Sequence, residues 1–195
     1  SWGDRILQFK LHYLYIINVA SGEPSTFFLE ASHRFYGAEK DNHVIETNRG
    51  IMWINTLSAY LFEGNPDEVI DLFRYAPEED KRQQGIGADD RTSRRISKED
   101  WADFFNSDTI MGYDPVERIV VIKRTCKATT TTGNTGDCYI YNMDNDTWTF
   151  ASNKWSSTIK CTNFVTDLDE NLVNIIEGGL SLSRGAGGDI RKKVG

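Results

Sequence analysis

The sequence is poor in the residues that build disulfide scaffolds and metal sites. It has three cysteines and three histidines in 195 residues. An odd and small number of cysteines excludes a disulfide-rich fold, so we expect folding in a reducing compartment. Cys126 and Cys138 flank a Thr/Gly loop, and two interpretations stay open: free half-buried thiols, or a pair facing each other across a hairpin. Cys161 has no evident partner.

Excess positive charge and long apolar runs are also lacking. A net charge of −7 gives no electrostatic reason to expect a nucleic-acid-binding surface. No apolar run approaches the roughly 20 residues that span a bilayer, so we expect no membrane insertion. The first residues have no basic and apolar signal sequence. They also lack an initiator Met, which suggests a processed, cut or incompletely recorded start.

What the sequence does contain is short β-type runs separated by turn residues. The central stretch, residues 108–150, holds four such runs at 110–113, 118–125, 138–141 and 147–150. Each is rich in β-branched or aromatic residues and bounded by Gly, Pro, Asn or Asp, which is typical of strands. Their connections are too short for crossover helices, so the sheet should be antiparallel.

The same pattern recurs along the chain. Before the centre, we expect strands at residues 4–9, 12–19, 26–31, 33–38, 43–47, 50–55 and 59–63, and a strand or helical turn at 68–73. Beyond it, we expect strands at 160–167, 171–177 and 180–183. Residues 12–19 are almost all apolar, which predicts a strand covered on both faces.

Second strands centred near Ile17, Ile54, Ile122 and Ile175 recur about every 40 residues once long loops are set aside, a spacing close to a propeller blade. The fold class is therefore mainly β. We expect residues 1–195 to form a β-propeller-like arc of roughly four antiparallel blades, the last incomplete. Because an open arc exposes two blade faces, we expect the chain to belong to a longer polypeptide or to be completed by another chain.

Two segments depart from the strand pattern. Residues 74–107 predict an inserted loop plus one short helix. Ser97 is a suitable N-cap, and Trp101, Phe104 and Phe105 share one helical face. The charged part of this insertion is either an idle solvated loop or a partner-binding arm. Residues 184–195 form a Gly-rich, basic tail that we expect to be weakly structured.

The side chains that could serve catalysis or bind a metal are better explained as structural residues. We therefore assign no catalytic, cofactor-binding or metal-binding residue. Carboxylates occur in turns, where Asp is a good turn former. Histidines are scattered rather than at ligand spacing. No nucleophile motif or phosphate-binding glycine loop is present. The carboxylates are Asp144, Asp146, Asp167, Asp169 and Glu170, and the histidines are His12, His33 and His43.

Two resemblances follow from these segments. Tyr141 and Trp148, separated by an Asp-Asn-Asp turn, are similar to the last half of a kelch repeat. A broader likeness is to bacteriophage tail proteins of the stabilisation, adaptor or tail nozzle type. Gly50, Trp53 and Asn55, followed by Tyr-Leu-Phe at residues 60–62, look like one blade of such proteins. The likeness also covers residues 28–37, 101–105, 111–115 and 136–141.

The tail-protein resemblance implies a non-enzymatic structural component of the virion tail, assembled in the host cytoplasm. It implies a ring of identical subunits around a DNA channel, in contact with other tail or adaptor proteins. DNA would pass without sequence-specific binding. The alternatives are a kelch-like propeller that binds a protein partner, and a glycan-binding or glycan-cleaving propeller of a receptor-binding tail part.

Overall fold

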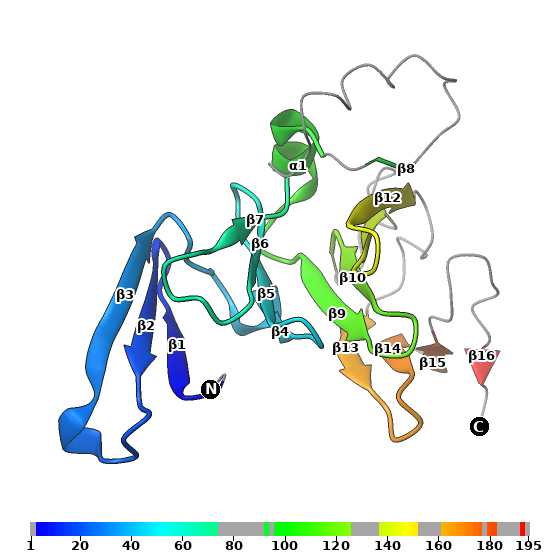
Figure 1. Ribbon diagram of the computed structural model, residues 1–195. Coiled ribbons are helices and arrows are strands. Elements are labelled where there is room, and N and C mark those ends of the chain that lie inside the picture. The colour runs from blue at the N-terminus through cyan, green and yellow to red at the C-terminus, as the bar shows by residue number, and fades with distance from the viewer. Residues whose placement is uncertain are drawn as a thin grey trace. The chain divides into compact units, whose positions relative to one another are not determined.

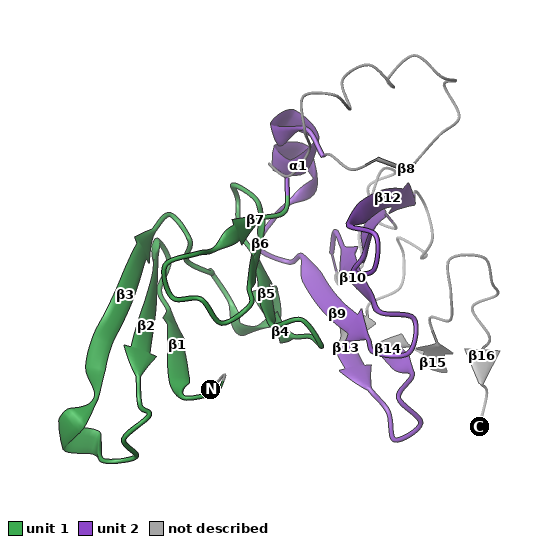
Figure 2. Ribbon diagram, in the orientation of Figure 1, with its two compact units in different colours: residues 1–72 green, residues 73–195 purple. Residues whose placement is uncertain are grey.

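The computed structural model of the chain describes residues 3–73, 92–93, 96–125, 137–151, 161–176, 179–182 and 192–193. The chain divides into two compact units, residues 1–72 and 73–195 (Figure 2). Each unit contains two antiparallel sheets, and each sheet is formed by strands that follow one another in sequence (Figure 1). The mainly β, antiparallel architecture is as the sequence predicts, and the described residues form no closed propeller.

The first sheet of unit 1 has three strands in the order β1-β2-β3. They are β1 (Arg5–Phe9), β2 (Tyr13–Asn18) and β3 (Phe28–Arg34), with a 3-10 turn at Pro24–Thr26 before β3. The predicted fourth strand at residues 33–38 is wrong. β3 itself continues to Arg34, and Phe35 then takes a φ of 74°, which ends the extended backbone.

The segment that follows β3 closes over the β1–β2 turn instead of adding a strand. The Phe35 amide donates to the His12 carbonyl, and the Ala38 amide donates to the Lys10 carbonyl. A Cβ on Gly37 would lie 2.0 Å from the Lys10 oxygen, so only glycine allows this approach. The amides of Phe35 and Ala38 therefore bond to the β1–β2 turn and not to a neighbouring strand.

The second sheet of unit 1 has four strands in the order β4-β5-β6-β7. They are β4 (Val44–Glu46), β5 (Ile51–Ile54), β6 (Ala59–Phe62) and β7 (Ile70–Asp71), preceded by a 3-10 turn at Asp41–His43. Of the two alternatives for residues 68–73, the strand is the one observed. The two sheets share one core made of Leu14 and Ile16 from β2 with Trp53, Tyr60 and Phe62.

Unit 2 opens with the short helix and the central sheet. The helix α1 (Lys98–Phe104) is confirmed, because Ser97 caps it by accepting from the Asp100 amide, and Trp101 and Phe104 are buried. The central sheet has the order β8-β12-β11-β10-β9. Its strands are β8 (Thr92–Ser93), β9 (Ile110–Asp114), β10 (Ile119–Lys123), β11 (Cys138–Asn142) and β12 (Thr147–Ala151).

The last sheet has the strand order β13-β14-β15-β16. Its strands are β13 (Cys161–Thr166), β14 (Leu172–Ile176), β15 (Gly179–Leu182) and β16 (Lys192–Lys193). β16 lies within the basic segment of residues 184–195, and β8 lies within the insertion of residues 74–107. The rest of the tail, and residues 74–91 and 94–95 of the insertion, lie outside the described residues.

Candidate interaction surface

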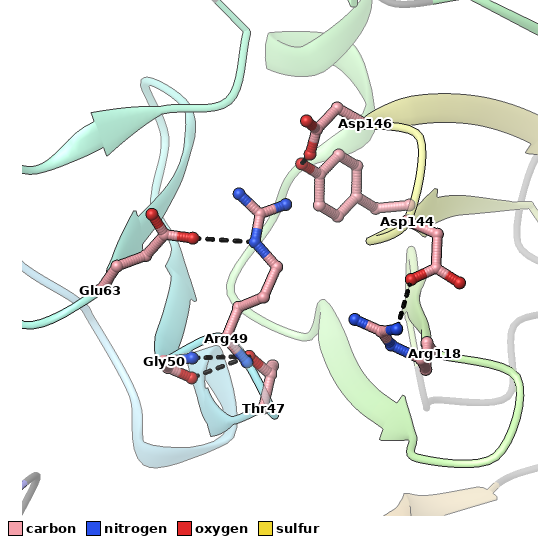
Figure 3. Close-up of polar contacts among 8 residues, drawn as sticks. Thr47, Arg49, Gly50, Glu63, Arg118, Asp144 and Asp146 are labelled. Carbon is pink, nitrogen blue, oxygen red and sulfur yellow. Dashed lines mark hydrogen bonds and ion pairs between the residues drawn. The ribbon is translucent and has the colours of Figure 1, made fainter.

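The carboxylates of the β11–β12 turn stabilise that turn. Asp144 forms an ion pair with Arg118 at 2.8 Å (Figure 3). Asp146 has a φ of 53° and accepts a hydrogen bond from the Tyr141 hydroxyl. The Asn142 side chain accepts from the Asp144 amide at 2.9 Å, which is an Asx turn. Asp144 and Asp146 therefore have structural partners and stand within one tight turn.

The β13–β14 turn uses its carboxylates in the same way. The Asp167 side chain accepts from the backbone amides of Asp169 and Asn171, at 2.9 and 2.8 Å. Glu170 takes a φ of 60°, and Asp169 is exposed. This geometry agrees with the interpretation of these residues as turn formers.

Histidines and cysteines occupy separate places. His12 lies in the β1–β2 turn, and His33 on β3 has its Nε2 2.7 Å from the Pro66 carbonyl. His43 is fully buried in unit 1. Cys138 lies in the buried core of unit 2 and Cys161 begins β13, whereas Cys126 lies outside the described residues. Within the part of the chain that the structure describes, no three His, Cys, Asp or Glu side chains gather as metal ligands.

An apolar surface is the feature that stands out instead. In β2 the alternation is clean: Leu14 and Ile16 are buried, while Tyr13, Tyr15 and Ile17 are half-buried. The prediction that residues 12–19 are covered on both faces is therefore wrong for this sheet, because one face packs on the second sheet and the other stays open. The open face continues onto β1 through Ile6, which is 39% exposed.

Residues at the start of β3 enlarge this open face. Phe28 and Leu29 are each 56% exposed, and Phe27 is 37% exposed. Together with Gln8, Tyr15 and Ile17 they line a shallow groove of about 390 Å³. Exposed apolar side chains that are clustered, rather than scattered singly, mark interaction surfaces. We refer to Ile6, Tyr15, Ile17, Phe27, Phe28 and Leu29 as the open face.

The charges around the first sheet are tied to other partners. Arg5 donates to Glu30 from both Nε and Nη2, at 2.7 and 3.0 Å. The hydrogen bond from Arg5 lowers the pKa of the Glu30 carboxyl below its usual value. The Arg34 guanidinium lies 4.7 Å from the centre of the Phe35 ring. The open face therefore suits an apolar partner better than a charged one.

No protein-family model, curated protein or solved structure matches the chain. The described residues also include no helix long and apolar enough to cross a membrane. The case for function therefore depends on the sheets and their surfaces.

Sequence reasoning missed the open face for a specific reason. The nearly continuous apolar run at residues 12–19 was interpreted as a strand covered on both faces. The same pattern arises when one face packs inside the chain and the other awaits an outside partner.

Proposed function

We propose that the chain is a structural component of a bacteriophage tail, in which its sheets serve as consecutive blades of a propeller-like array within a ring of identical subunits. The observation that carries the proposal is the series of four antiparallel sheets whose first member keeps an exposed apolar face. A sheet array of this kind needs a further sheet to cover that face. The resemblance of residues 50–55, 59–64, 101–105 and 111–115 to tail nozzle proteins supports the same function.

The second sheet explains physically why the Gly-x-x-Trp-x-Asn pattern suits such an array. Gly50 has a φ of 153°, and a Cβ there would lie 2.0 Å from the Phe62 carbonyl. Trp53 is fully buried between the two sheets of unit 1. Asn55 donates to the carbonyls of Phe35 and Gly37, so it ties the second sheet to the segment leaving the first. The motif thus joins one sheet to the next.

The function would be carried out through subunit interfaces, with DNA passing and not being held. Tight binding to duplex DNA requires several cationic contacts to phosphates, which a net charge of −7 does not favour. We expect no retention of duplex DNA by the purified protein at about 0.15 M salt. Tight, salt-sensitive binding in a filter assay would contradict a passive conduit.

Negative-stain imaging of the purified chain tests the proposal, and rings of identical subunits are the expected result. Replacing Phe28 and Leu29 by Asp should prevent assembly while far-UV circular dichroism stays unchanged. Leu57→Asp is the matched control, because Leu57 is 51% exposed but lies outside the open face. Monodisperse monomers at every concentration, or equal loss of assembly in the control, would reject the proposal.

A kelch-like binding module is the alternative, and one observation favours it. Tyr141 and Trp148 lie directly opposite each other on β11 and β12, with ring centroids 4.7 Å apart. Tyr141 also donates to Asp146 in the intervening turn. A protein that stays monomeric yet captures a partner through its blade loops would favour this function over the tail assembly.

A further inference from the structure

The first sheet has one strand fewer than the second and fourth sheets, and its two edges differ. The sheets β4–β7 and β13–β16 have four strands each, whereas β1-β2-β3 has three. β1 and β3 are therefore both edge strands within the described residues. Edge strands present unpaired backbone N–H and C=O groups, which other strands can bind.

The hydrogen bonds at the two ends of β1 show which of its groups point outward. The Val19 amide donates to the Asp4 carbonyl, and the Lys10 amide donates to the Tyr13 carbonyl. Both pairs keep the register of the β1–β2 ladder. Because hydrogen-bonded pairs alternate in an antiparallel ladder, Ile6 and Gln8 also bond β2. Arg5, Leu7 and Phe9 therefore direct their backbone groups away from β2, and β1 pairs with no other described strand.

The edge of β3 is protected, and the edge of β1 is not. β3 carries a bulge, since Ala31 pairs with Ile16 while Leu29 pairs with Ile17, which leaves Glu30 as the extra residue. A bulge twists an edge and opposes further pairing. β1 keeps continuous register over all five residues and contains no proline. A regular edge with alternate side chains in a core is the better acceptor for a strand.

We propose that the free edge of β1 is a binding site for an extended segment of a neighbouring polypeptide, which pairs antiparallel with β1 and gives the first sheet four strands. The outward N–H and C=O groups of Arg5, Leu7 and Phe9 complement the backbone of an extended strand. The segment should be apolar at alternate positions. On one face it would continue the core formed by Leu7 and Phe9, and on the other it would lie beside exposed Ile6.

This inference deepens the proposed function, because it names one contact by which the sheet array would be completed, yet it is tested separately. Amide hydrogen exchange of the full chain, followed by NMR, reads each residue of β1. In the isolated chain, Ile6 and Gln8 should exchange slowly, and Leu7 and Phe9 should exchange fast. Slow exchange of all four amides in a monomer would show that the edge is already occupied, which overturns the proposal.

A second experiment attaches a strand covalently to the chain so that it can pair with β1. A five-residue strand of alternating Val and Thr is joined ahead of Arg5 through an Asn-Gly turn, a sequence that favours hairpins, so that the added strand lies opposite Arg5 to Phe9. Exchange of Leu7 and Phe9 should slow about tenfold or more, with Ile6 and Gln8 little changed. The matched control carries Pro at the centre of the added strand and should give no protection. Unchanged exchange rates of the Leu7 and Phe9 amides with the Val/Thr strand would reject the proposal.

The same exchange measurement identifies the source of the natural segment, and together with imaging it tests the strand site and the tail function independently. Protection of Leu7 and Phe9 that rises with protein concentration would support the site and identify a second copy of the chain as the donor. Rings in which these two amides stay fast would reject the strand site but leave the tail function intact. Strand protection without rings would reject the tail function alone.

Discussion

In each of the two units one sheet packs against the next, but the side chains that make this contact differ. In unit 1 the contact is built from large groups: Trp53 is fully buried and lies edge-on to Phe9, with ring centroids 5.2 Å apart. In unit 2 the contact of β9 with β13 and β14 depends on a missing side chain. Gly112 leaves space that Phe164 and Leu172 fill. One contact fails when a side chain is removed, the other when one is added.

A second parallel concerns the turns that fix each sheet. In unit 1 the Asn55 side chain accepts from the amides of Leu57 and Ser58 and donates to Phe35 and Gly37 carbonyls. In unit 2 the Asn106 side chain accepts from the Asp108 amide and donates to the Arg124 carbonyl. Both amides join a local turn to a segment distant in sequence, but Asn55 makes more such bonds.

The largest expected effect is on the core of unit 1. Trp53→Ala should lower the free energy of unfolding by about 3–5 kcal/mol, because it opens a large cavity between the two sheets. Trp53→Phe should cost much less, since ring packing is retained. Denaturant unfolding followed by near-UV circular dichroism measures both. A loss under about 1 kcal/mol for Trp53→Ala would show that this residue does not seal the sheets.

The reverse substitution applies to unit 2. A Cβ at Gly112 would lie 2.4 Å from the Phe164 Cβ and 2.9 Å from a Leu172 methyl, so Gly112→Ala forces the sheets apart. Overpacking of this kind costs about 1–3 kcal/mol. Gly22→Ala is the control, because a Cβ there meets no atom within 4 Å and its cost is limited to a φ of 73°. Equal costs in thermal unfolding would mean that space at Gly112 is not limiting.

The turn comparison gives a smaller effect. Asn55→Ala should cost about 2 kcal/mol, because it leaves buried backbone groups without partners. Asn55→Asp keeps the acceptor for Leu57 and Ser58 but loses the donor to Phe35 and Gly37, so its cost should be intermediate. Asn106→Ala should cost less than Asn55→Ala. Urea unfolding of the three variants measures these costs. A larger loss for Asn106→Ala than for Asn55→Ala would show that the number of hydrogen bonds lost does not set the cost.

The smallest effect is a pH dependence confined to unit 2. Burial, helped by the charges of Asp100 and Asp137, raises the pKa of Tyr139 to about 12 from its usual 10.0. Between these values the unfolded chain loses the phenol proton and the folded chain keeps it, so stability falls as pH rises. The slope should stay below the about 1.4 kcal/mol per pH unit of one fully differential proton. Tyr139→Phe should reduce the dependence of the free energy of unfolding on pH in this range. An unchanged slope would show that another group causes it.

Much of the fold could be predicted because its signals are local. Strands such as β10 and β12 are short β-branched or aromatic runs between turn residues, and the α1 helix has its own N-cap in Ser97. The proposed centres Ile17, Ile54 and Ile175 lie in the second strand of their sheets, and Ile122 lies in β10, next to the edge strand β9. The turn roles of Asp144 and Asp167 follow equally from local chemistry.

The errors all arose where the answer depends on contacts distant in sequence. The sequence alone set the element types, the antiparallel order and the recurring sheets, since these follow from side-chain periodicity and turn residues. Only the tertiary structure decided that residues 35–38 close a turn and that one face of β2 stays open. The physical reason is that an apolar residue gains by burial against any partner, so its pattern does not say which sheet, or which chain, provides the cover.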